Sequence, residues 1–151
     1  MRVLVVAALA ALVPLLPLAA QSADPKTTPV VQGSWTYSVT PDGSQATFAN
    51  AGALPQLALQ CTRATRQVRI SKPATAPIAS LGVWTSEMSR NLPAGFDAAN
   101  GRVNSVVTAF DPLLDALALS RARIAVSVPG AAPLVLPSAP EVTRVVEDCR
   151  A

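Results

Sequence analysis

The 151-residue chain contains no histidine, the most common general base and the most common transition-metal ligand in proteins. Neither a Ser-His-Asp nor a Cys-His arrangement can therefore form. The sequence also lacks a GxSxG elbow, a Walker loop, an EF-hand loop and an HExxH motif. We therefore predict no catalytic residue, no cofactor-binding residue and no metal ligand.

Charge and aromatic residues are also scarce. Charged residues make up 14% of the chain and aromatic residues 4%, and the formal net charge is only +3. This charge is weak and scattered, and it offers no counterpart to a phosphate backbone. No aromatic residues alternate with the basic ones to form a base-stacking platform. We expect no nucleic-acid partner.

Long hydrophobic runs are absent except at the N-terminus. Arg2 precedes an uncharged segment that ends in small and polar residues, which is the pattern of a secretory signal peptide over residues 1–23. The alternative, a membrane-spanning helix, needs about 20 uninterrupted apolar residues. Here Pro14 and Pro17 interrupt the run, and no basic cluster follows it. We expect a periplasmic or secreted chain that begins near Asp24 and keeps no stable membrane span.

The chain has only two cysteines, Cys61 and Cys149. An exported chain meets an oxidising compartment, and two cysteines allow a single pairing. We predict a disulfide that closes a loop of about 88 residues. Two buried free thiols are one alternative. A redox or catalytic cysteine is the other, although no CxxC motif accompanies either residue.

Short alternating segments indicate β-strands. In the first, residues 34–40, Trp35, Tyr37 and Val39 share one face. Further strands are predicted at residues 44–49, 56–61, 66–71, 80–86, 102–110, 123–128 and 133–137, and residues 89–95 either extend a strand or return beside it. Residues 102–110 are rich in β-branched side chains, but their alternation is irregular.

Two short helices complete the pattern. Asp111 as N-cap and Pro112 at the first helical position predict a helix over residues 111–120. Ser138 followed by Glu141 predicts a capping box for a C-terminal helix. That helix places Val142, Val145, Val146 and Cys149 on one face.

These elements predict one domain. After the signal peptide at 1–23, residues 24–33 form an extended leader and residues 34–151 a single β-rich domain. The strands are short and show no βαβ rhythm. We therefore predict a mainly β fold, a small antiparallel sandwich or barrel with two short helices, the second C-terminal, and one disulfide.

The densest basic group is a candidate ligand-binding surface for anionic glycans or lipid headgroups. It consists of Arg63, Arg66, Arg69 and Lys72. The alternative is a solvated strand edge whose charges discourage edge-to-edge association.

Two further groups have both a functional and a structural interpretation. Asp111 and Asp115 could form a catalytic carboxylate pair, but their spacing suits a helix cap and a surface position better. Trp35 and Trp84 could stack on a sugar ring, although tryptophan in a small β-domain more often fills the core.

Two segments resemble a known group of proteins. The tail DPLLDALALSRARIAVSVPGAAPLVLPSAPEVTRVVEDCR, with LALQCTRATRQVRIS, resembles uncharacterised exported proteins of sphingomonad-type alphaproteobacteria. The Trp-bearing first strand, the LxLxC strand and the C-terminal cysteine are similar, more loosely, to β-sandwich proteins typified by invasion-associated locus B and by type VI secretion accessory proteins. Ala122 departs from the first group, where glycine is common. The resemblance assigns no functional residue.

Together these features predict an exported, non-catalytic accessory or binding protein of the bacterial cell envelope. Its partner would be an unknown protein or envelope ligand. Two alternatives remain open. One is a histidine-free hydrolase acting on cell-wall glycans, and the other is an inhibitor or chaperone-like partner of a secreted enzyme.

Overall fold

The structure, a computed structural model, describes residues 23–151. The signal peptide predicted at residues 1–23 therefore lies, except for Ala23, outside the described residues. The described chain is mainly β, with two antiparallel sheets, two helices and a disulfide between Cys61 and Cys149. The predicted fold class is confirmed.

The larger sheet, sheet A, has six strands in the order β1-β2-β3-β4-β8-β7. Its strands are β1 (Gly33–Thr40), β2 (Gly43–Asn50), β3 (Pro55–Thr62), β4 (Gln67–Pro73), β8 (Arg102–Thr108) and β7 (Gly95–Asp97). A 3₁₀ turn, η1 (Arg63–Thr65), joins β3 to β4. The first four strands follow one another as antiparallel neighbours, as short connections favour.

The smaller sheet, sheet B, has four strands in the order β10-β9-β5-β6. Its strands are β5 (Ser80–Trp84), β6 (Ser89–Pro93), β9 (Arg123–Ser127) and β10 (Leu134–Pro137). Residues 89–95 thus return beside β5 as a separate strand and do not extend it.

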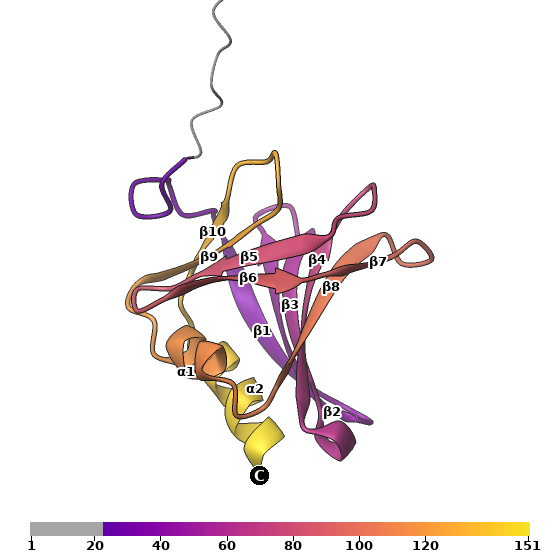
Figure 1. The fold of residues 1–151 in the computed structure, drawn as a ribbon. Coiled ribbons are helices and arrows are strands. Elements are labelled where there is room, and N and C mark those ends of the chain that lie inside the picture. The colour runs from indigo at the N-terminus through magenta and orange to yellow at the C-terminus, as the bar shows by residue number, and fades with distance from the viewer. Residues whose placement is uncertain (1–22) are drawn as a thin grey trace, which may run out of the picture.

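Sheet B and the two helices, α1 (Pro112–Ala118) and α2 (Pro140–Arg150), cover the same face of sheet A (Figure 1). One contiguous core fills the space between them, because alternate residues of the strands and the valine face of α2 point into it. Its largest fully buried side chains include Phe48, Leu57, Leu59, Ile70 and Leu113. The opposite face of sheet A is left uncovered by these elements.

The first strand departs from its predicted pattern. Trp35 is buried and Tyr37 is half-buried, but Val39 is 71% exposed. Val39 lies next to the turn that joins β1 to β2, beyond the part of the strand that the core covers. The irregular alternation of residues 102–110 has a different cause. Ser105 is a buried inward-facing residue whose hydroxyl donates to Pro93 O at 2.9 Å.

The capping box predicted for the last helix is wrong. Ala139 is the N-cap of α2, and no side chain caps this end. Ser138 directly follows β10, and its backbone N–H donates to Ala122 O at 3.2 Å, so it is still in the strand connection. Pro140 occupies the first helical turn as predicted, and the valine face with Cys149 is buried.

The segment at residues 24–33 is fastened to sheet B. It contains a turn, and Arg123 of β9 donates from Nη1 to the carbonyl oxygens of Pro25, Lys26 and Thr28 at 3.3, 2.9 and 3.2 Å. Val31 N–H donates to Val135 O of β10. The chain therefore reaches β1 across the end of sheet B.

Candidate functional site

The uncovered face of sheet A carries rows of polar side chains that cross several strands. The strand register aligns Ser38, Gln45, Gln60, Arg69 and Val106 in one row and Thr36, Thr47, Ala58, Ser71 and Asn104 in the next. A sheet face exposed to water is expected to be polar. Amides, hydroxyls and a guanidinium at adjacent positions also form a dense set of hydrogen-bonding groups.

These rows form the floor of a hollow of about 460 Å³, which we call the sheet A groove. Its polar lining residues are Gln45, Thr47, Gln60, Arg69, Ser71, Asp97, Asn100, Arg102 and Asn104. Asp97 is the last residue of β7, and Asn100 lies in the connection from β7 to β8; both line the groove at the side of these strands. The groove depends on the strand order, because β4, β8 and β7 are neighbours only in the folded sheet.

Two arginines give the groove its charge. Arg102 is fixed, donating from Nε to Ser71 Oγ at 2.6 Å and from Nη2 to Ser71 O at 3.0 Å. The ion pairs of residues 23–151 are Arg90–Asp111 and Arg150–Asp115, so Arg69 has no such partner in this range. Arg69 is thus a cation that can turn toward an incoming anion.

Asp97 is the one carboxylate among the groove-lining residues of the described chain. The Asn100 side chain donates to it at 2.5 Å and is the main reason that the pKa of Asp97 lies below its ordinary value. Arg69 lowers this pKa further, by a smaller amount. Asp97 is therefore ionised at neutral pH. Its carboxylate already accepts hydrogen bonds within its own loop, from the Asn100 side chain and from the backbone N–H of Ala99.

The four residues of the predicted basic surface do not meet in one place. Arg69 lies in the sheet A groove, whereas Arg63 lies on η1 and Arg66 at the end of that turn. The guanidinium of Arg66 lies 5.9 Å from the centre of the Phe110 ring. Lys72 is half-buried, and burial, followed by the nearby charge of Arg102, lowers its pKa. Of the four, Arg69 alone lines the groove.

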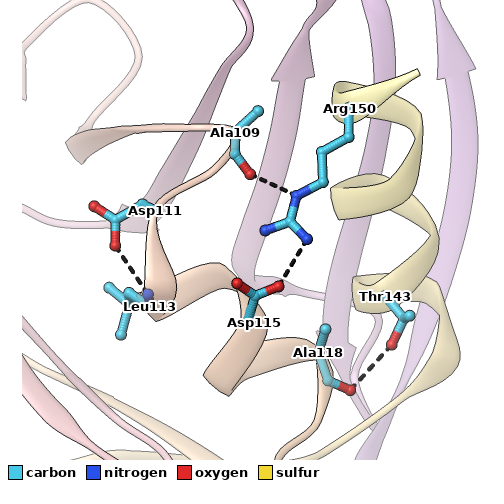
Figure 2. Close-up of polar contacts among 7 residues, drawn as sticks. All are labelled: Ala109, Asp111, Leu113, Asp115, Ala118, Thr143 and Arg150. Carbon is cyan, nitrogen blue, oxygen red and sulfur yellow. Dashed lines mark hydrogen bonds and ion pairs between the residues drawn. The ribbon is translucent and has the colours of Figure 1, made fainter.

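Asp111 and Asp115, the predicted alternative of a catalytic pair, each make contacts within the fold (Figure 2). Asp111 caps α1, accepting from Leu113 N–H at 2.8 Å, and pairs with Arg90 at 2.7 Å. Asp115 accepts from Arg150 Nη1 at 2.7 Å, and Arg150 Nε also donates to Ala109 O. Each carboxylate thus joins elements of the fold, which is the role that the structural interpretation gives to both.

Asp111 makes the acid sensitivity of the fold testable. The hydrogen bond from Arg90 is the main cause of the lowered pKa of Asp111 in the folded protein. The contribution of the ionised carboxylate to stability is therefore full above the pKa of about 3.9 that an aspartate has in the unfolded chain, and it is lost as the pH falls through the lower pKa of the folded state. We expect Asp111→Asn, which keeps a good N-cap, to lower the free energy of unfolding by about 1 kcal/mol at neutral pH. Urea unfolding at pH 7 and near pH 2 measures this. A difference from wild type that persists unchanged at pH 2 would contradict the electrostatic explanation.

Residues missed by sequence reasoning supply most of the groove. Gln60 and Arg69 are on outward positions of predicted strands, so their direction is readable from alternation. Asn104, Arg102 and Asp97 join them only through the pairing of β4 with β8 and of β8 with β7. No group of three or more metal-ligating side chains occurs in residues 23–151.

Comparison with known proteins adds no assignment, because no protein-family model, curated protein or solved structure matches the chain. None of the helices in the described range is long and apolar enough to cross a membrane.

Proposed function

We propose that this chain is an exported, non-catalytic binding protein of the bacterial cell envelope, related to the sphingomonad-type exported proteins that it resembles. The disulfide between Cys61 and Cys149 supports export, because such bonds persist in the periplasm and outside the cell and are rare in the cytosol. The N-terminal segment with a signal-peptide pattern supports it independently.

The sheet A groove is the proposed binding surface, and Arg69 is the observation that carries this proposal. It is an exposed guanidinium without an ion-pair partner in residues 23–151, among amide and hydroxyl side chains. An arginine in such a setting can bind a carboxylate with two parallel hydrogen bonds. Gln45, Gln60 and Asn104 can in turn bind hydroxyl and amide groups.

This chemistry fits an anionic glycan, whose units combine a carboxylate with hydroxyl and amide groups. Asp97 would repel a second negative charge, and it is near enough to Arg69 for the arginine to lower its pKa, so the anionic group is expected on the side of Arg69 away from Asp97. The ligand would lie across β3 and β4, with its neutral part toward β2.

The test is binding of a purified disaccharide–tetrapeptide fragment of peptidoglycan, measured by calorimetry and by NMR shifts of groove amides. We expect Arg69→Gln to weaken binding about tenfold or more, the loss typical of one charge-assisted hydrogen bond. Arg63→Gln is the matched control, because Arg63 is also an exposed arginine but lies outside the groove. It should leave affinity unchanged.

The same experiment separates the alternatives. Absence of binding, or equal loss in both variants, would overturn the proposed groove. Cleavage of the fragment would show a hydrolase, and a stoichiometric complex with a secreted enzyme, without glycan binding, would show an inhibitor or chaperone-like partner. Export has its own readout, because protein recovered from the envelope should have a mass lacking about the first 23 residues.

A further inference from the structure

A second hollow, of about 450 Å³, lies on the outer face of sheet B, and we call it the Trp84 hollow. Gly82 of β5 forms its floor, directly opposite Ser127 of β9 on one side and Asn91 of β6 on the other. Trp84 stands two residues along β5 and thus on the same face. Three strands therefore supply the floor. The connection from β9 to β10 and the N-terminal residues Ala23 and Pro25 supply the rest of the lining, and Ala23 is the last residue of the predicted signal peptide.

The absent side chain of Gly82 lets two polar side chains converge over its backbone. A Cβ at this position would lie 2.5 Å from Ser127 Oγ and 3.0 Å from Asn91 Oδ1, so any side chain here would displace one or both groups. With glycine, a hydroxyl and an amide lie side by side on the floor of the hollow, where one ligand atom can contact both.

Trp84 differs from the other tryptophan of the chain. Trp35 is 8% exposed, and its indole N–H donates to Pro137 O at 2.8 Å, so it fills the core. Trp84 is only half-buried and lines the hollow. Its indole offers a flat apolar surface beside the polar floor, together with an N–H donor.

The hollow has no charged side chain among its lining residues in the described chain. Its polar side chains are the amide of Asn91 and the hydroxyls of Ser80, Ser89 and Ser127. The sheet A groove, in contrast, contains two arginines and a carboxylate. A charged ligand would gain no ionic partner in the Trp84 hollow and would lose part of its hydration there.

We propose that the Trp84 hollow binds a neutral saccharide ring. The apolar C–H face of a pyranose packs on the Trp84 indole, and one sugar hydroxyl binds to the Ser127 hydroxyl and the Asn91 amide where they converge over Gly82. A flat apolar surface beside a few converging neutral hydrogen-bonding groups matches both faces of a sugar. This site is on the other sheet from the groove and does not depend on the anionic ligand.

The test uses chitotriose and maltotriose, two neutral trisaccharides, and follows the two indole N–H resonances of the purified protein by NMR. Trp84→Phe assigns the resonances, because the chain has only two tryptophans. We expect one or both sugars to shift the Trp84 resonance and leave that of Trp35 in place. Gly82→Ala should weaken binding about tenfold or more, because its methyl group would displace the Ser127 hydroxyl and the Asn91 amide from their positions over the strand.

Asn91→Ala provides a second variant that leaves the strand backbone unchanged, and it should also weaken binding. Arg69→Gln serves as the control and should bind the neutral sugars like wild type. If neither trisaccharide shifts the Trp84 resonance, or if Gly82→Ala and Asn91→Ala bind as tightly as wild type, the proposal is wrong. Because the probes carry no charge, this result would leave the anionic groove untouched.

Discussion

Replacing both Cys61 and Cys149 with alanine is expected to lower the free energy of unfolding by about 4.5 kcal/mol. The bond joins residues 88 apart, and in the chain-entropy model a loop of this length restricts the unfolded state by that amount. This equals a large part of the net stability of a typical domain. Urea unfolding of the double variant and of wild type under oxidising conditions measures the difference.

The position of the bond explains why it should affect the whole domain. Cys61 lies on β3, near the middle of sheet A, and Cys149 lies in the last turn of α2, with their Cα atoms 5.5 Å apart. Both residues are at most 1% exposed. The bond therefore holds the C-terminal helix against the strands that form the core.

Reductant supplies the control for this experiment. It should destabilise wild type toward the value of the double alanine variant and leave the variant itself unchanged. Alkylation followed by mass measurement should label two thiols in wild type only after reduction and unfolding. A double variant whose free energy of unfolding stays within about 1 kcal/mol of wild type would contradict the loop-entropy explanation.

The disulfide was predictable because the choice of its two cysteines did not depend on the three-dimensional structure. With two cysteines and an export pattern, only one pairing existed. The N-cap of α1 was predictable for a similar reason, since Asp111 and Pro112 act within a single turn. The cap of α2 was not, because Ser138 forms the exit from β10 and its backbone N–H is bound by Ala122, a residue distant in the sequence that directly precedes β9.

Backbone conformation set another limit on prediction. Ala53, Arg66 and Ala122 have positive φ values, a region that favours glycine. Ala122, at φ 65°, adopts this conformation without the freedom of glycine. An alanine with a positive φ cannot be recognised from a single sequence, because its side chain makes no hydrogen bond that would indicate this conformation.

The proposed binding surfaces were the least predictable part. Alternation indicated that Arg69 points outward, yet four nearby basic residues looked like one surface and are divided between the groove, η1 and a half-buried site. The groove itself depends on how β4 pairs with β8, a contact between residues 29 to 41 positions apart in the chain. Strand order is a property of the whole fold and cannot be read from local periodicity.

Replacing Phe48 with alanine is expected to lower the free energy of unfolding by about 3–5 kcal/mol, the range for a buried phenylalanine. Phe48 lies on β2 with 0% exposure and packs edge-on against Trp35, with ring centres 5.5 Å apart. The substitution leaves a cavity that the paired strands on both sides cannot close. Thermal and urea unfolding measure the loss.

Phe110→Ala is the matched control, because it removes the same atoms from a side chain that is 60% exposed. Arg66 and Arg150 lie 5.9 and 5.7 Å from the Phe110 ring, and exposed contacts of this kind contribute little, so we expect a loss below about 1 kcal/mol. The difference between the two losses in free energy of unfolding measures the effect of burying the ring, because both variants remove the same atoms. Equal losses would contradict the conclusion that Phe48 lies in a core formed by β1, β2 and the elements packed on them.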